Sequence, residues 1–238
     1  MGVYSNTEIL AGLESGNVVI DPFNPSHVNT SSYDVTLGHY FYKSGIGGGD
    51  TLYNPYDADE VEKHFGELME AEPLFEHSTV MRRLGIQAFK GIPSDHPVII
   101  LRPHERILAH TQEFIGIRGQ GTTSMQARST TGRNGVVVCM DAGWGDTGYI
   151  GRWTMEIKNH NEQYVVIPVG IRIAQIVFHH TGIVVGEYAR MSGKYQEGTA
   201  DDLATLKARW HPSQMKPKSY KDQIVLPAHV DGLPEGLK

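Results

Sequence analysis

The chain has 238 residues, of which 39% are hydrophobic and 20% charged, a composition too apolar for a disordered protein and typical of a globular domain. The net charge of −6 gives no support for duplex nucleic acid as the main partner, and no apolar run approaches the roughly 20 residues that span a bilayer. We therefore expect a globular protein that binds neither duplex nucleic acid nor a membrane.

The single cysteine, Cys139, excludes an internal disulfide and a cysteine-rich zinc site. Because it lies in the apolar run VVVCM, we expect a buried and unreactive thiol. The first residues, MGVYSNTEIL, lack the basic start and apolar core of a secretory signal peptide. Together these features predict a cytoplasmic protein.

The first predicted element is a helix over residues 5–16, SNTEILAGLESG. Capping residues such as Ser5 begin it, Leu10 and Leu13 share one of its faces, and Gly16 ends it. Two segments with strand-like patterns follow, VVIDPF and SSYDVTLGHYFY.

The pattern breaks after Lys43. SGIGGGD predicts a flexible turn, and residues 57–77 are acidic and mostly helix-forming. We interpret residues 44–96 as an insertion on the surface of the main fold. A solvated helical flap is the simpler interpretation, and a functional lid over a site is the alternative.

Short strand patterns separated by glycine and proline fill the region from Pro97 to Val185. The predicted strands are VIILRP, RILAHTQEFI, VVVCM, WTMEIKN, QYVVIPV, RIAQIVFHH and GIVVGEY. Their spacing indicates a mostly β sandwich, jelly roll or barrel, and there is no βαβ alternation, P-loop or G-x-G-x-x-G motif. Residues 198–238 predict a helix, DDLATLKARW, and an extended tail that packs on the body or on a neighbour.

The segment ARSTTGRNG, residues 127–135, combines two arginines, three hydroxyl side chains and two glycines between apolar strands. Glycine lets backbone N–H groups approach an anion, hydroxyls donate, and arginine presents a planar fork to phosphate. The segment is either an anion-binding loop or an ordinary polar turn. Downstream, Arg172 and Gln175 interrupt an apolar strand, so they need partners, either structural or from a ligand.

Glu156 lies inside the alternating strand WTMEIKN, on the face opposite Trp153, Met155 and Ile157. It is either a solvated strand carboxylate or a group that moves a proton. Zinc-dependent deamination needs a P-C-x-x-C motif, which a chain with one cysteine does not contain. A serine-hydrolase G-x-S-x-G motif is absent too. An enzyme of this sequence would therefore use a carboxylate base and a metal carried by its substrate.

Four motifs in order, SSYDVTLG, ARSTTGRNG, AGWGDTGYIGRWTMEIKN and GIRIAQIVF, resemble the dCTP deaminase and trimeric dUTPase superfamily. The start, TEILAGLESGNVVIDPF, is similar to the deaminase branch, and the resemblance covers residues 5–42 and 97 to about 197. It implies a single dUTPase-like domain, a distorted jelly roll with a short N-terminal helix, over residues 1–238, with the helical insertion 44–96 and a C-terminal extension 198–238. It also implies a homotrimer with active sites between subunits, and Mg²⁺ bound through the nucleotide triphosphate.

The resemblance assigns roles to several residues. In the family, the residues matching Arg128, Ser129 and Arg133 hold the phosphates and the reacting region, and the one matching Asp146 contacts the deoxyribose. The remaining substrate-binding positions that it indicates are Trp144, Gln175, Tyr188, Lys194 and Gln196.

The deaminase branch is distinguished by a T-x-E-x-x-N pattern, present here as Thr154, Glu156 and Asn159. Glu156 therefore resembles the deaminase general base. Hydrolytic deamination adds water to C4 of cytosine and expels ammonia, and a carboxylate whose pKa is raised by partial burial can take and return the protons. Ser129 and the backbone carbonyl of Ala142 would hold the water, and Arg133 would stabilise the developing charge.

Several alternatives stay open from the sequence. The small and aromatic residues of AGW, 142–144, favour a bifunctional enzyme that continues from dUTP to dUMP, over a monofunctional deaminase. A dUTPase that has retained a glutamate, or a non-catalytic jelly-roll module that binds nucleotide or protein, would also carry these motifs. Thr147 and Asn134 depart from the usual deaminase pattern. Whether dTTP inhibits, and whether the base is a modified cytosine, is open as well.

Overall fold

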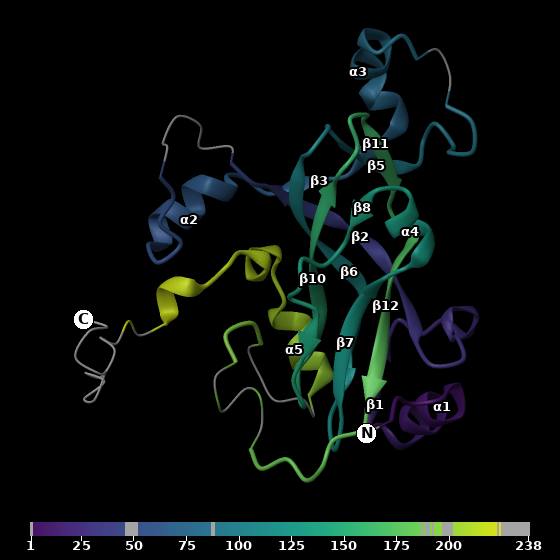
Figure 1. The fold of residues 1–238 in the computed structure, drawn as a ribbon, viewed down its shortest axis with the longest axis vertical. Coiled ribbons are helices and arrows are strands. Elements are labelled where there is room, and N and C mark those ends of the chain that lie inside the picture. Colours follow the sequence, from purple (N-terminus) through teal and green to yellow (C-terminus); the bar gives the residue numbers. More distant parts are fainter. Residues whose placement is uncertain are drawn as a thin grey trace, which may run out of the picture.

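Antiparallel strands form the centre of the molecule and confirm the mostly β prediction (Figure 1). The computed structural model describes residues 2–45, 52–86, 89–186, 188, 191, 193–196, 202–222 and 224. Its strands are β1 (Val18–Asp21), β2 (Tyr33–Lys43), β3 (Met69–Glu70), β4 (Glu72–Pro73), β5 (Pro97–Leu101), β6 (Arg106–Ile117), β7 (Thr122–Ala127), β8 (Val136–Val137), β9 (Trp144–Gly145), β10 (Ile150–Asn159), β11 (Val165–Pro168) and β12 (Arg172–His179).

Short helices surround the strands. The α-helices are α1 (Asn6–Ser15), α2 (Ala58–Phe65), α3 (Ser78–Arg83), α4 (Ser129–Arg133) and α5 (Leu203–Arg209), and the 3₁₀ turns are η1 (Pro25–His27), η2 (Leu74–His77), η4 (Pro212–Met215) and η5 (Ser219–Lys221). In the described part of the chain, no helix has the length and apolarity needed to cross a bilayer.

The long strand β6 organises the main sheet, which has nine strands in the described part of the chain. One edge of β6 pairs with β10 along most of its length, and its other edge pairs with β2 and then with β1. The sheet runs in the order β8, β10, β6, β2, β12, β7, β9, and a three-stranded sheet contains β11, β5 and β4. This pairing places Glu156 of β10 opposite Leu108 of β6.

The alternation predicted for β10 is confirmed. Trp153, Met155 and Ile157 are buried in the main core, whereas the intervening side chains, Glu156 among them, are partly exposed on the other face. Each fully buried large apolar side chain contributes about 1.5–3 kcal/mol to the hydrophobic driving force. The sheet therefore fixes which face carries polar groups, and Glu156 lies on that face.

The predicted N-terminal helix is confirmed, and the structure shows which of its faces is buried. Ser5 caps α1 and accepts a hydrogen bond from the backbone of the first turn, and Gly16 ends it in the left-handed conformation at φ 76°. Ile9 is the buried side chain, Leu13 is partly buried, and Leu10 is 41% exposed. Positions four apart, such as 9 and 13, lie on one helix face, and the chain packs that face on β1.

Residues 57–77 are less helical than predicted. Helix α2 ends at Phe65, and β3 and β4 then pair with β2 and β5. Their backbone groups find partners on open strand edges, which outweighs the helix propensity of an acidic segment. The predicted turn SGIGGGD lies mostly outside the described residues, and the status of 44–96 as an insertion stays a prediction.

The C-terminal segment packs on the body, as one of the two predicted arrangements requires. The predicted helix is confirmed as α5, whose Leu206 is buried against Val19 and Ile150. Farther along, Met215 joins the buried cluster formed by Phe65 of α2 and its neighbours on β2 and β6. In Figure 1 this segment, drawn in yellow, runs from α5 toward α2. Residues 198–201, 223 and 225–238 lie outside the described residues.

Other sequence predictions in the strand-rich region need correction. Residues 129–133 form the helix α4 rather than a loop, and residues 182–186 are not a strand although Ile183 and Val185 are apolar. These two side chains are 85% and 86% exposed, so no strand or core among the described residues covers them. Conversely, TTSMQA forms β7, because its backbone pairs with both β12 and β9.

Candidate active site

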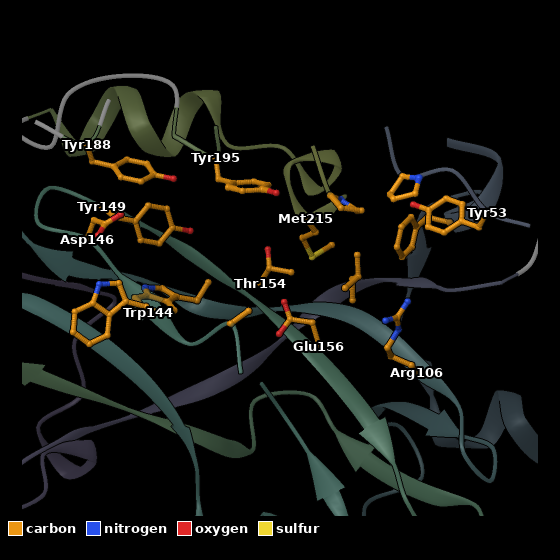
Figure 2. A pocket seen from close by; sticks show the side chains of 16 residues that line it. Tyr53, Arg106, Trp144, Asp146, Tyr149, Thr154, Glu156, Tyr188, Tyr195 and Met215 are labelled. Carbon is orange, nitrogen blue, oxygen red and sulfur yellow. The ribbon is translucent and has the colours of Figure 1, made fainter. Parts of the chain in front are cut away.

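A cleft of about 530 Å³ opens above the polar face of β10 and β6 (Figure 2). Its lining combines the two strands, the turn that includes Asp146, the segment around α2, and the C-terminal segment. The lining residues are Tyr53, Pro55, Phe65, Arg106, Leu108, Ala142, Trp144, Asp146, Tyr149, Trp153, Thr154, Glu156, Tyr188, Tyr195, Met215 and Pro217. The predicted residues Glu156, Ala142, Trp144, Asp146 and Tyr188 therefore meet in one place.

Glu156 lies on the floor of the cleft. Its carboxylate accepts a hydrogen bond from the Met140 backbone N–H at 3.4 Å. Burial raises the pKa of Glu156 above its ordinary value, while N–H donors and the positive charge of Arg106 oppose the shift. A carboxylate in this state accepts and returns protons near neutral pH more readily than a solvated one.

Cys139 lies close to Glu156 and is half-buried against the main core, where the sequence predicted a buried thiol. Burial, followed by the negative charge of Glu156, raises the pKa of its thiol to about 11. The thiol is therefore protonated at neutral pH, and the prediction of an unreactive cysteine agrees with this environment.

Aromatic side chains form one end of the cleft. Tyr149 contacts Trp153 and Tyr188 edge-on, with ring centroids 5.5 and 5.2 Å apart. Burial raises the pKa of both tyrosines, so their hydroxyls remain neutral donors. Trp144 is 63% exposed, and Asp146 is exposed at the same end. These groups could stack on a ring and bind a sugar hydroxyl there.

The predicted phosphate-binding residues do not line this cleft. Arg128, Ser129 and Arg133 belong to α4 and its cap, and the side chains of Ser129 and Arg133 are exposed. Arg128 lines a second cavity, of about 580 Å³, between α4 and β11. Helix α4 is held on β12, because Thr131 Oγ1 donates to the Ile173 carbonyl at 3.0 Å.

Asp34, whose role sequence reasoning missed, holds two arginines beside α4 although it lines neither of these two cavities. Its side chain is only 2% exposed, and its Oδ2 forms ion pairs with Arg128 Nε at 3.1 Å and with an Arg172 nitrogen at 3.3 Å. Its Oδ1 accepts a hydrogen bond from Asn29 at 2.9 Å. Asp34 thus provides the structural partner that Arg172 was expected to need. An acid inside the strand-like run YDVTL was the available signal.

The remaining predicted binding residues lie outside the cleft lining. Gln175 is partly buried on β12, opposite Asp34 of β2. Lys194 pairs with Asp222, and Gln196 is buried, with its side-chain amide accepting from Ile150 N–H at 2.7 Å and donating to the Gly148 carbonyl at 3.0 Å. In this structure Gln196 holds the turn beside the cleft, and its binding role stays a prediction. Parts of the signature EYARMSGKYQEGT lie outside the described residues.

Three comparisons place this arrangement among known proteins. The fold is similar to that of a solved 2'-deoxycytidine 5'-triphosphate deaminase from Agrobacterium tumefaciens, with a TM-score of 0.51 and 15% sequence identity. That match covers 81% of this chain and 54% of the solved chain, so this chain spans about half of its length. At this identity the likeness shows the fold alone, a mostly antiparallel β-fold as predicted.

The family model described as dCTP deaminase-like matches residues 3–181, and the chain belongs to this family. One curated relative, from Methanosphaerula palustris, is 27% identical over 208 residues, covering 87% of this chain and 95% of its own. Another, from Methanobrevibacter smithii, is 31% identical over 179 residues, covering 75% of this chain and 80% of its own. Each is named dCTP deaminase, dUMP-forming. The matched family region ends before the C-terminal segment that borders the cleft.

Proposed function

We propose that the chain converts dCTP to dUMP, with release of ammonia and pyrophosphate. The observation that carries the proposal is the carboxylate of Glu156, partly buried on the floor of the cleft with a raised pKa. The names of the relatives, dCTP deaminase, dUMP-forming, support both the substrate and the product. The predicted bifunctional enzyme is therefore favoured over a deaminase that stops at dUTP.

In the proposed first step Glu156 takes a proton from water as the water oxygen adds to C4 of cytosine. The proton passes to ring N3, and Glu156 then helps to protonate the amine, so that ammonia leaves and the C4 carbonyl forms. Ala142, in the cleft lining, would offer its backbone carbonyl to the attacking water. Water then attacks the triphosphate in the same site, where Asp146 is the carboxylate at the exposed end.

We propose that α4 of a neighbouring copy completes the site. Ser129 and Arg133 are exposed and outside the cleft of their own chain, so a trimer with sites between subunits would deliver them to another chain's Glu156. Arg128, fixed by Asp34, would hold a phosphate in the same arrangement. Mixing Glu156→Gln with Arg133→Ala protein tests this, because mixed trimers would regain some complete sites. Inactive mixtures, with exchange of subunits verified, would contradict it.

Mg²⁺ is proposed to enter with the triphosphate, since this ion is bound in many enzymes by substrate phosphates and few carboxylates. Asp146, whose side chain is exposed in the cleft, offers an oxygen donor of the required kind, and Glu156 keeps its proposed role as the base. No zinc is proposed to take part, because the chain has a single cysteine, which argues against the cysteine-containing zinc sites of nucleobase deaminases. Among the described residues, no group of three or more His, Cys, Asp or Glu side chains could hold a metal ion. Inhibition by dTTP stays a prediction.

The test is product analysis. Purified protein is incubated with dCTP and Mg²⁺, the nucleotides are separated, and ammonia and pyrophosphate are assayed. We expect ammonia, dUMP and pyrophosphate in equal amounts. Accumulating dUTP would indicate deamination alone. Turnover of dUTP without turnover of dCTP would indicate a diphosphatase, and binding without any turnover a non-catalytic module.

The variant Glu156→Gln is expected to lower turnover of dCTP by about 10²–10⁴-fold, the usual contribution of a positioned acid–base group. Glu162→Gln is the matched control, because the Glu162 side chain is 80% exposed and pairs with His104 at the surface. Comparable activity of the two variants would show that Glu156 is not the base.

A further inference from the structure

Arg106 is the only cation among the described residues that line the cleft. The strands β6 and β10 pair antiparallel, and this pairing places Glu156 opposite Leu108. Arg106 lies two residues before Leu108 on the same face of the sheet, which makes it a diagonal neighbour of Glu156 within reach of a long side chain. Figure 2 shows both side chains on the floor of the cleft, with Glu156 between Arg106 and the end that carries Asp146.

The guanidinium of Arg106 has no carboxylate as a structural partner in the described part of the chain. The adjacent acid, Glu105, pairs with Lys43 at 3.3 Å. Arg106 Nε donates to Ser44 Oγ at 3.3 Å, and this hydroxyl donates to the Arg106 carbonyl at 3.2 Å. These contacts fix the side chain and use only one of its five N–H donors. Arg106 is therefore a half-buried cation whose charge is not neutralised by another acid.

Three influences set the charge state of Glu156. Burial raises the pKa of its carboxyl, the backbone N–H groups of Glu156 and Met140 lower this pKa, and the positive charge of Arg106 lowers it further. A nearby opposite charge favours the ionised form of a carboxyl group. The N–H groups belong to the backbone, whereas the charge of Arg106 can be removed by substitution.

The other titratable groups around Glu156 do not bring a positive charge into the cleft. Besides Cys139, whose thiol is protonated, the titratable groups on the surrounding elements are Tyr53, His64, His110, Asp141, Lys158 and Tyr195. Burial lowers the pKa of His64, and it lowers that of His110 to about 4, so both are neutral at neutral pH. Lys158 lies on the same face of β10 as Glu156 but does not line the cleft.

The proposed function, on which this inference rests, needs an ionised Glu156 before the first step, because only the carboxylate can take a proton from water. Burial without a compensating charge would leave a larger share of the base protonated and inactive. The carboxylate bonds to the Met140 N–H and not directly to Arg106. Because no direct ion pair holds it, Glu156 can still return the proton to the leaving amine.

We propose that Arg106 is a positioning residue for the reaction, which acts through Glu156 by favouring the ionised form of this base. This role does not require Arg106 to touch the nucleotide. It extends the pH range in which deamination proceeds toward lower pH, because the base then stays ionised at a lower pH.

The test is the pH dependence of kcat/KM for dCTP, followed by ammonia release, in the wild type and in Arg106→Met. The acidic limb of the profile should move to higher pH by about one pH unit, so that activity falls roughly tenfold on that limb and recovers as the pH rises. Arg106→Lys keeps the charge and should stay closer to the wild-type profile. Ionisation of dCTP itself is the same in every variant, so it does not affect the comparison.

Lys158→Met is the matched control. Lys158 lies directly opposite Arg106 on the same pair of strands, so its substitution removes an equal charge outside the cleft lining. This variant should keep the acidic limb of the wild type. A second readout needs no turnover: a carbon-13 NMR titration of the Glu156 carboxyl in the nucleotide-free protein, with its signal identified by its loss in Glu156→Gln. The midpoint should rise in Arg106→Met and stay unchanged in Lys158→Met.

The outcomes separate this inference from the proposed function. If the wild type releases ammonia from dCTP but Arg106→Met keeps both the acidic limb and the NMR midpoint, the inference is wrong. A higher KM at every pH with an unmoved limb would show that Arg106 binds the nucleotide instead, which would also overturn it. Equal loss of activity at every pH would show a structural role only. No ammonia from the wild type would refute the proposed function, whereas the NMR midpoints would still report whether Arg106 acts on Glu156.

Discussion

Asp34→Asn tests whether one buried carboxylate fixes the arginines beside α4. In the wild type, Asp34 Oδ2 pairs with Arg128 at 3.1 Å and Arg172 at 3.3 Å, and Oδ1 accepts from Asn29. Asparagine keeps an oxygen for Asn29 but turns an N–H₂ donor toward two cations. Both arginines then lose their anion, and α4 loses the contact that orients its cap.

The expected loss of stability in Asp34→Asn follows from how deeply the ion pairs are buried. Removing one partner of a fully buried ion pair costs about 3–5 kcal/mol. The side chains of Arg128 and Arg172 are 28% and 41% exposed, whereas that of Asp34 is 2% exposed. Because both arginines can regain part of their hydration, we lower the expected loss in the free energy of unfolding to about 2–3 kcal/mol.

The assay is urea unfolding at fixed protein concentration, with hydrogen exchange of residues 128–133 as the local readout. Asp21→Asn is the control, because Asp21 pairs with Lys207 and their side chains are 35% and 49% exposed. That substitution should cost less than about 1 kcal/mol. If Asp34→Asn costs no more than Asp21→Asn, or exchange in α4 is unchanged, the reasoning is refuted.

Two further predictions concern the cleft. Burial raises the pKa of Glu156 in the folded state, so ionisation of this carboxyl opposes folding as the pH rises from the ordinary glutamate pKa of 4.5 through the raised pKa. Glu156→Gln should therefore unfold at a higher urea concentration than the wild type at pH 7, and this gain in stability should shrink toward pH 4.5. A gain in stability that does not depend on pH would contradict this assignment. Lys216→Met keeps the aliphatic stem of the side chain but removes the cation over Tyr42 and the contact with Glu62, whose side chain is 64% exposed. We expect the free energy of unfolding to fall by about 1–2 kcal/mol and hydrogen exchange in residues 212–221 to become faster. Exposed Lys221 offers the control Lys221→Met, and equal exchange in the two variants would show that the contacts of Lys216 do not hold this segment.

The local elements were the most predictable part of the fold. The cap at Ser5 and the glycine at Gly16 define α1, and the two-residue period of WTMEIKN places Glu156 on the polar face of β10. Both depend on chain geometry within a few residues, which the sequence displays directly. The prediction was wrong where the conformation of a segment depends on its pairing partner. The segments β3 and β4 are extended rather than helical, because they pair with open edges of β2 and β5.

The same distinction between local and long-range effects holds for the residues of the candidate site. The motifs indicated that Glu156, Asp146 and Trp144 belong to one site, and all three line the cleft because they lie in the short stretch of chain from β9 to the middle of β10. Tyr53 and Met215 could not be assigned to it from the sequence, since a long stretch of chain separates each from Glu156. They reach the cleft only because α2 and the C-terminal segment pack together.

The sequence by itself determined which groups are available for chemistry: a carboxylate in an alternating strand, a polar arginine segment and a single thiol. The tertiary structure alone decided how they are combined. Glu156 gains its raised pKa from burial by distant segments, and Arg128 is held by Asp34 far earlier in the chain. Both effects come from packing and from charges at close range, and these depend on three-dimensional distance, which spacing along the chain does not encode.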